Sequence, residues 1–219
     1  MNVHMLAQLR AEMVQKQIQE RGITNEAVLR AMQSVPRHLF VPDRYQHRAY
    51  DDGPLPILAG QTISQPYVVA LMVTQLSLLP TDRVLEIGTG SGYAAAILSR
   101  IVTQVYTIER HHKLVEYAQS RFDLLGYTNI QVRHGDGTQG WPEHAPYEGI
   151  IVAAGGPTVP RSLQKQLSVG GRLVIPVGKK KRQQRLIRIT RTGAEQFDHE
   201  RLNPVAFVPL IGEEGWEEE

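Results

Sequence analysis

The stretch VLEIGTGSGYAAAIL, residues 84–98, constrains the fold of this chain more than any other. An apolar run typical of a buried strand ends in three alternating glycines, and an Ala-rich helical segment follows. Glycines at a strand-to-helix turn let the backbone approach a ligand closely. In an open α/β sheet such a turn lies at the carboxyl edge of the strands. The stretch therefore predicts a nucleotide-like site at that edge.

Short runs rich in Val and Ile alternate with helical segments after Pro80. This alternation predicts the α/β class, with a doubly wound, mostly parallel sheet and helices on both faces. We expect a late antiparallel strand in RLIRITR, at an edge of the sheet, and another strand in AFVPL. The main strand runs are RVLEIG, QVYTIE, IQVRHGD, YEGIIVAAG and GRLVIPV, and the helical segments are SGYAAAILSRI, HHKLVEYAQSRFDLL and VPRSLQKQL.

The first part of the chain is predicted to be helical and to cover the active-site edge. One helix is expected over 6–22, and a second begins at Thr24 or Asn25 and ends before Pro36. Residues 51–65 are rich in Gly and Pro and predict a loop, followed by a helix over 66–79. We expect one domain over 1–219, made of an N-terminal part (1–79), an α/β core (80–178) and C-terminal strands with a frayed acidic tail, EEGWEEE (179–219).

Acidic residues follow three successive strands. Glu86 precedes the glycines, Glu109 lies 19 positions after Gly90, and Asp136 lies in the turn GDG. An acid about 20 residues past such a turn can accept hydrogen bonds from a ribose diol. The window 90–95 also satisfies the loose dinucleotide fingerprint, so NAD is an alternative. However, the charge of Glu86 opposes a pyrophosphate and suits a cation, which favours S-adenosylmethionine with its amine, sulfonium, ribose and adenine.

At this point the sequence resembles a known family. The pattern E-x-G-x-G-x-G, the later acid and the GD turn resemble class I S-adenosylmethionine-dependent methyltransferases. More narrowly, the chain is similar to the protein-L-isoaspartate O-methyltransferase family over nearly its whole length, and GQTISQP with GDG-x-x-GW is the most specific part. The segments that carry the resemblance are VPRHLFVP, PLPILAGQTISQPYVVA, VLEIGTGSGY, RHGDGTQGW, LQKQLSVGGRLVIPVG and FVPL.

The resemblance implies a Rossmann-like fold and methylation of the free α-carboxylate of L-isoaspartyl residues in damaged proteins. The methyl donor would be S-adenosylmethionine, which leaves S-adenosylhomocysteine. Ser64 is implied as the active-site residue, in a positioning role, and it is also suited to cap the helix that starts at Pro66. The implied cofactor residues are Glu86, Gly88, Gly90, Gly92, Glu109, Asp136 and Gly137. The substrate residues that we expect are Asp51, Thr62, Ile63, Gln65 and Val208.

Composition limits the other functions. The 219 residues carry a net charge of +2, so nothing favours nucleic acid or an anionic membrane as a partner. The absence of cysteine excludes thiolate and zinc–sulfur chemistry. The basic run KKKRQQR is expected to be a solvated hairpin tip, and His111-His112 shows no metal-ligand spacing, so we expect no metal. The first residues lack the pattern of a secretory signal, and we expect a cytoplasmic monomer.

Three other functions stay open on the sequence. The chain could be a class I methyltransferase that acts on a small molecule or RNA, although the GQTISQP loop argues against it. An NAD-dependent oxidoreductase would need a second glycine turn for the nicotinamide half, and no such turn follows another strand. A non-catalytic binding module need not bind S-adenosylmethionine at all.

Overall fold

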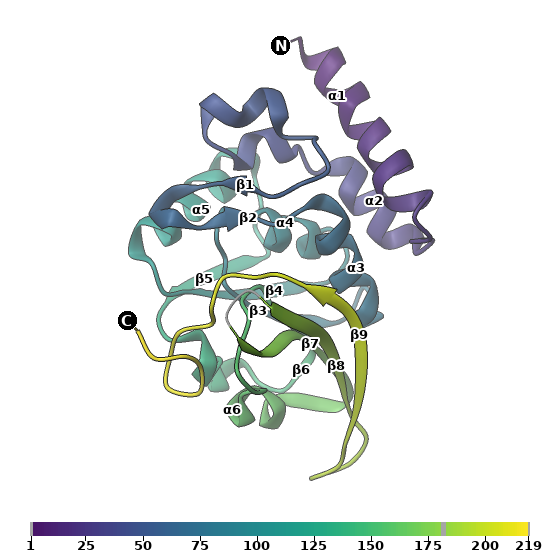
Figure 1. Cartoon of the computed structure of the whole chain (residues 1–219). Coiled ribbons are helices and arrows are strands. Elements are labelled where there is room, and N and C mark those ends of the chain that lie inside the picture. The colour runs from purple at the N-terminus through teal and green to yellow at the C-terminus, as the bar shows by residue number, and fades with distance from the viewer. Residues whose placement is uncertain (1, 181–182, 219) are drawn as a thin grey trace.

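Seven strands form one sheet in the order β5-β4-β3-β6-β7-β8-β9 in the computed structural model, which describes residues 2–180 and 183–218 (Figure 1). The pairs from β5 through β7 are parallel, and β8 and β9 are antiparallel to their neighbours. The predicted α/β, mostly parallel sheet is confirmed, and each Val- and Ile-rich run forms a strand. The strands are β3 Arg83–Ile87, β4 Gln104–Glu109, β5 Ile130–His134, β6 Tyr147–Val152, β7 Leu167–Lys180, β8 Gln183–Arg191 and β9 Phe197–Val205.

The order of the strands in the sheet changes direction between β3 and β6. The chain runs outward from β3 to β4 and β5, then returns to the other side of β3 with β6 and β7. The connections that leave β3 and β6 therefore diverge at their carboxyl ends and leave a crevice there. Ligands of doubly wound sheets bind at such a point.

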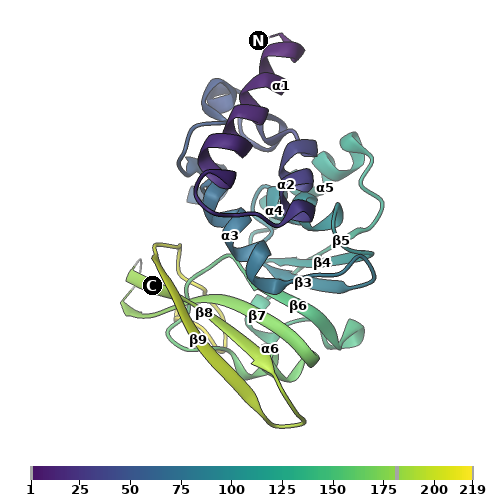
Figure 2. The same ribbon diagram turned by 90° about the vertical axis from the view of Figure 1, so that its right-hand side faces the viewer.

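Helices cover the two faces of the sheet unequally (Figure 2). On one face α3 (Pro66–Leu76), α4 (Tyr93–Ser99) and α5 (His112–Leu125) share a core with Val84 and Val105. Leu85 and Leu173 point to the opposite core, because successive residues of a strand alternate between faces. That second face is covered by the short α6 (Arg161–Lys165) and by the 3-10 turns η5 (Gly137–Gln139) and η6 (Pro142–His144).

The N-terminal helices belong to the same core as the sheet. The predicted first helix forms as α1 (Val3–Glu12) followed by a π-helical segment, η1 (Met13–Gln19), whose buried residues include Met13 and Ile18. The second helix, α2 (Glu26–Ser34), starts where expected, because Oδ1 of Asn25 accepts the N–H of Val28 at 3.1 Å. Two 3-10 turns complete this region, η2 Arg37–Phe40 and η3 Asp43–Arg48.

The predicted loop over 51–65 contains a small hairpin. Its strands are β1 (Leu55–Pro56) and β2 (Thr62–Ile63), joined through the 3-10 turn η4 (Leu58–Gly60). The next helix, α3, ends at Leu76 rather than at Leu79, since Ser77 has left-handed backbone angles with φ of 50°. The segment before α3 therefore has regular structure and is not an irregular loop.

Two expectations for the C-terminal strands were wrong. RLIRITR forms the antiparallel β8, but β8 is interior and β9 occupies the edge. The residues of β9 are mostly exposed, so its sequence lacks the apolar alternation that indicates a strand. AFVPL leaves the sheet after β9, and an isolated bridge joins Pro209 to Gly155 at the end of β6.

The described part of the acidic tail, residues 213–218, is held by hydrogen bonds and is not frayed as expected. The N–H of Glu213 donates to Oδ2 of Asp136 at 2.8 Å, and Nε1 of Trp216 donates to the carbonyl of Gly155 at 2.9 Å. These bonds fasten the tail to the carboxyl edge of the sheet. Two residues of the basic run KKKRQQR, 181 and 182, lie outside the described residues. Within 2–180 and 183–218, no helix has the length and apolar character needed to cross a bilayer.

Candidate active site at the carboxyl edge of the sheet

A pocket lies at the carboxyl ends of β3 and β6, where the sheet reverses direction. Its walls come from the hairpin before α3, the glycine turn after β3, the end of β4, the turn after β5, the end of β6 and the C-terminal segment after β9. The lining residues are 61–64, 69, 86–91, 93, 94, 108–111, 137, 153, 154 and 208–211. Segments far apart in the sequence thus meet at one site.

The glycine turn after β3 is tied to β4 by its backbone. The N–H of Gly88 donates to the carbonyl of Ile108 at 2.8 Å, and Gly88 and Gly90 have φ of 90° and 55°. Such left-handed angles favour glycine, because a Cβ would crowd the following carbonyl. Both residues line the pocket, as expected of cofactor-binding glycines.

Gly92 has a packing reason of its own. Its φ is 88°, and a Cβ built there would lie 2.7 Å from Cζ of Phe122 in α5. Gly92 precedes α4 and does not belong to the lining residues given above. The third glycine of the motif therefore lets α4 approach α5 closely.

Glu86 places a buried carboxylate beside the glycine turn. It is 1% exposed, and its Oε2 accepts the hydroxyl of Thr107 at 2.6 Å. Its Oε1 has no hydrogen-bond partner among the described residues. Burial raises the pKa of Glu86 to about 8; the Thr107 hydrogen bond opposes this rise, and the charge of Glu109 adds to it. A cationic ligand group at Oε1 would satisfy both the orphan atom and the charge.

Glu109 is the last residue of β4, and its carboxylate accepts two backbone N–H groups. Its Oε2 accepts the N–H of Gly90 at 2.9 Å, and its Oε1 accepts the N–H of His111 at 2.9 Å. It is 5% exposed and lines the pocket. The carboxylate thus joins the glycine turn to the end of β4 at the place where the sequence predicts ribose binding.

Asp136 is engaged in local structure. Its Oδ1 accepts the N–H and the hydroxyl of Thr138, both at 2.8 Å, and its Oδ2 accepts the N–H of Glu213 at 2.8 Å. Asp136 does not belong to the lining residues of the pocket, whereas Gly137 does. A Cβ at Gly137 would lie 2.3 Å from Cγ2 of Ile87, so only glycine fits against the end of β3.

Ser64 lines the same pocket as the glycine turn, together with its neighbours Thr62 and Ile63. It does not cap α3, because the residue at the cap position is Gln65 and no side chain makes a capping bond there. The carbonyl of Ser64 accepts Nη2 of Arg37 at 2.8 Å. In the described part of the chain, no hydrogen bond involves the Ser64 hydroxyl, which therefore stays available to a ligand.

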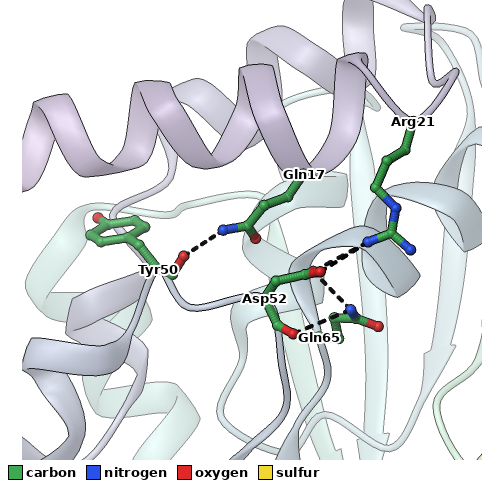
Figure 3. A network of polar contacts seen from close by, with 5 residues as sticks. All are labelled: Gln17, Arg21, Tyr50, Asp52 and Gln65. Carbon is green, nitrogen blue, oxygen red and sulfur yellow. Dashed lines mark hydrogen bonds and ion pairs between the residues drawn. The ribbon is translucent and has the colours of Figure 1, made fainter.

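Gln65 and Asp51 do not reach the pocket. Nε2 of Gln65 donates to Oδ1 of Asp52 at 2.7 Å, and Asp52 forms an ion pair with Arg21 of the N-terminal region (Figure 3). Figure 3 also shows Gln17 donating to the carbonyl of Tyr50. Asp51 forms an exposed ion pair with Arg48. These residues support the outside of the β1–β2 hairpin.

Val208 lines the pocket from the C-terminal side. Its carbonyl accepts the N–H of Gly155 at 2.7 Å, and the N–H of Leu210 donates to the carbonyl of Gly155 at 2.9 Å. This pairing holds the segment against the end of β6. The residues predicted from the sequence do not include Thr89, Ser91, Tyr93 or the neighbours 209–211, which also line the pocket. Tyr93 was signalled only by its place directly after the third glycine.

The residues of the pocket fit S-adenosylmethionine. The orphan oxygen of Glu86 suits a cationic group, and Glu109 offers carboxylate oxygens at the end of the next strand. The glycine turn allows close approach of a ligand to the backbone. Within the described ranges, no group of three or more His, Asp or Glu side chains could hold a metal ion.

Comparisons with known proteins agree with this geometry. The family model described as Protein-L-isoaspartate(D-aspartate) O-methyltransferase (PCMT) matches residues 8–215. A Protein-L-isoaspartate O-methyltransferase 2 of Pelobacter propionicus is 57% identical over 93% of this chain and 91% of its own length. A Protein-L-isoaspartate O-methyltransferase of Pelotomaculum thermopropionicum is also 57% identical, over 96% of this chain and 91% of its own.

Solved structures give the same result. A protein-L-isoaspartate O-methyltransferase aligns with a TM-score of 0.84 at 29% identity, over 94% of this chain and 67% of the other. A structure described as a putative protein-L-isoaspartate O-methyltransferase from Plasmodium falciparum, in complex with S-adenosyl-L-homocysteine, aligns with a TM-score of 0.80 at 26% identity, over 92% and 98% of the two chains. The chain therefore belongs to the protein-L-isoaspartate(D-aspartate) O-methyltransferase family.

Proposed function

We propose that the Ser64 hairpin binds the isoaspartyl carboxylate while the glycine turn binds S-adenosylmethionine in the same pocket. The activity of the chain is that of its family, transfer of a methyl group from S-adenosylmethionine to an isoaspartyl residue. The observation that carries the residue roles is that Ser64 and Gly88 line one pocket. A transfer between two bound molecules requires their reacting atoms to be enclosed together.

The reaction needs positioning rather than a base. S-adenosylmethionine supplies an electrophilic methyl group on a sulfonium. The α-carboxylate of the peptide is already ionised at neutral pH, because carboxyl pKa values lie near 4. One carboxylate oxygen forms a bond to the methyl carbon, the carbon–sulfur bond breaks, and its electron pair stays on sulfur. No proton moves. The peptide nitrogen of the following residue then attacks the ester carbonyl and loses its proton, and methanol leaves. The resulting succinimide is hydrolysed by water, which returns part of the material to aspartate.

Residues on the sheet side of the pocket hold the cofactor in this proposal. Glu86 binds a cationic part of it, Glu109 binds the ribose hydroxyls, and Gly88, Gly90 and Gly137 leave room for it. Support comes from the buried, half-satisfied carboxylate of Glu86 and from the positive φ of the two turn glycines. Gly92 and Asp136 contribute through the packing and capping contacts described above.

Residues of the hairpin and of the C-terminal segment hold the peptide. The hydroxyl of Ser64 hydrogen-bonds the isoaspartyl carboxylate without adding charge, and Thr62, Ile63 and Val208 contact the peptide backbone. Support comes from the Ser64 hydroxyl, which has no hydrogen bond to another described residue, and from the fact that all four residues line the pocket. Gln65 and Asp51 act from outside the pocket, by supporting the hairpin.

A pair of matched peptides tests this proposal. The protein is mixed with S-adenosylmethionine carrying a labelled methyl group and a peptide with either L-isoaspartate or L-aspartate at one position. We expect base-labile label on the isoaspartyl peptide alone, and Ser64→Ala to raise KM for that peptide while the Kd for S-adenosylhomocysteine stays the same. Equal label on both peptides, or an unchanged KM in Ser64→Ala, would contradict the assigned role of the hairpin.

The oligomeric state, the compartment and the cooperativity of folding form a second part of the proposed function. We infer a monomer that acts in the cytoplasm as one cooperative unit over 1–219. The common core of the N-terminal helices and the sheet supports a single unit, and the absence of cysteine suits a reducing compartment. Light scattering after gel filtration gives the mass, and coincident unfolding curves from fluorescence and circular dichroism test the single unit. A mass of two chains, or separate transitions, would contradict it.

A further inference from the structure

A buried arginine lies directly under the substrate hairpin. Arg37 has no exposed surface, although it follows Pro36 in a short 3-10 turn near the N-terminus. Its Nε donates to the carbonyl of Ala49 at 2.8 Å, and its Nη2 donates to the carbonyl of Ser64 at 2.8 Å. The guanidinium carbon lies 4.8 Å from the ring centroid of Tyr93. One side chain thus touches Ala49 at the end of η3, Ser64 directly after β2, and Tyr93 at the start of α4.

The charge of this buried cation is not neutralised by a carboxylate in the described part of the chain. No carboxylate among the described residues forms an ion pair with Arg37, and its Nη1 has no hydrogen-bond partner there. Burial lowers the pKa of Arg37 to about 10, so the side chain is still charged at neutral pH. A buried charge is usually paired, because its desolvation is costly. Here two carbonyl dipoles and the face of Tyr93 compensate only part of that cost.

The contacts of Arg37 converge on the proposed site. Ser64 and Tyr93 both line the pocket, one on the side assigned to the peptide and the other beside the glycine turn. The bond to the Ser64 carbonyl orients the peptide group between Ser64 and Gln65, and hence the direction of the Ser64 side chain. A fixed positive charge behind that residue also favours an anion in front of it.

We propose that Arg37 is a positioning residue for methyl transfer, which orients Ser64 and favours the isoaspartyl carboxylate through its unpaired charge. The inference rests on the proposed role of Ser64. Arg37 of the segment VPRHLF thereby takes part in substrate binding, although it is fully buried and does not line the pocket. Arg37 orients Ser64 through the hydrogen bond to its carbonyl, acts on the carboxylate through its charge, and does not touch the reacting atoms.

Two variants separate charge from geometry. Arg37→Lys keeps the charge but cannot donate to two diverging carbonyls from a planar group, and Arg37→Met keeps most of the volume without charge. We expect KM for the isoaspartyl peptide to rise on the order of 10-fold in Arg37→Lys and more in Arg37→Met. The Kd for S-adenosylhomocysteine, measured by calorimetry, is expected to change by less than about 3-fold. Arg30→Met, at an exposed ion pair of α2, is the matched control and is expected to behave as wild type.

A double-mutant cycle decides whether Arg37 acts through Ser64. If it does, adding Arg37→Lys to Ser64→Ala raises KM little beyond the larger single effect. Additive effects on KM, or a parallel loss of affinity for S-adenosylhomocysteine, would overturn the inference and leave Arg37 as a general structural residue. If Arg37→Met does not fold, as circular dichroism would report, Arg37→Lys alone completes the cycle. An inactive wild-type protein would contradict the proposed function instead, and the two failures are therefore distinguishable.

Discussion

The backbone N–H of Gly90 donates to Oε2 of Glu109 at 2.9 Å, across 19 positions of sequence. The second oxygen of the same carboxylate accepts the N–H of His111. One acid therefore fixes the glycine turn relative to the end of β4. The acid whose spacing predicts ribose binding thus also holds in place the glycine turn that lines the pocket.

Replacing Glu109 by Gln is expected to weaken cofactor binding. The amide can accept one of the two backbone N–H groups, but its NH₂ then faces the other donor, and one N–H is left unpaired. We expect the Kd for S-adenosylhomocysteine to rise on the order of 10-fold, because one buried hydrogen bond and the ribose contact are lost. Calorimetry measures this, and an unchanged Kd would remove Glu109 from the cofactor site.

Glu86 is expected to make the unliganded protein less stable as pH rises. Its carboxyl has a pKa near 4.5 when unfolded and of about 8 when folded. Between these values the folded protein holds a proton that the unfolded chain has released, so the free energy of unfolding falls as pH rises. Glu86→Gln lacks this contribution. Its stability relative to wild type, from urea unfolding, is therefore expected to increase from about pH 5 to about pH 8. Parallel pH curves for the two proteins would contradict the assigned burial.

Binding of the cofactor is expected to release a proton near neutral pH. A cationic ligand group favours the ionised form of Glu86, whose unliganded pKa is about 8. The affinity for S-adenosylhomocysteine is therefore expected to increase as pH rises toward 8, and Glu86→Gln to flatten that dependence. Calorimetry in buffers of different ionisation enthalpy counts the released protons. Equal heats in all buffers would show that the ligand does not act on this carboxylate.

Gly92→Ala is expected to be more destabilising than Gly126→Ala. Both glycines have positive φ, but a Cβ at Gly92 would lie 2.7 Å from Phe122, whereas one at Gly126 meets no atom within 4 Å. We expect Gly126→Ala to lower the free energy of unfolding by about 1–2 kcal/mol through backbone strain. Gly92→Ala adds an overpacking cost of about 1–3 kcal/mol. Urea unfolding compares the two, and equal losses would mean that α4 and α5 adapt to the added methyl group.

Glu214 is expected to stabilise the second face of the sheet. Its carboxylate accepts the N–H groups of Arg161 and Ser162 and the hydroxyl of Ser162, at the start of α6. Because these groups have no partner within the helix, Glu214→Ala is expected to cost about 1 kcal/mol, as loss of a cap does. Glu217→Ala is the matched control, since Glu217 is exposed. It is expected to stay within about 0.5 kcal/mol of wild type. Equal effects of the two changes would indicate that the tail is bound without this cap.

Much of the fold could be predicted from local sequence. Buried parallel strands are continuous apolar runs, so the sequence pattern alone indicates β3, β4 and β6. The start of α2 is likewise indicated by Asn25, a residue type that caps helices well. In contrast, β9 could not be predicted, because an edge strand with polar, exposed residues has no apolar pattern. The attachment of the C-terminal tail could not be predicted either. It depends on hydrogen bonds to Asp136 and Gly155, which are distant in sequence.

The sequence by itself determined the class of fold, the glycine turn and, through its resemblance to a family, the family to which the chain belongs. These features can be recognised from local patterns, because all the residues that define each pattern lie within one short segment of the chain. Only the tertiary structure decided that Ser64, Gly88 and Val208 line one pocket, that Gln65 points instead to Asp52, and that Arg37 is buried beneath Ser64. Such contacts form between segments that the sheet brings together, because the order of its strands, and not their separation in sequence, sets which residues are neighbours.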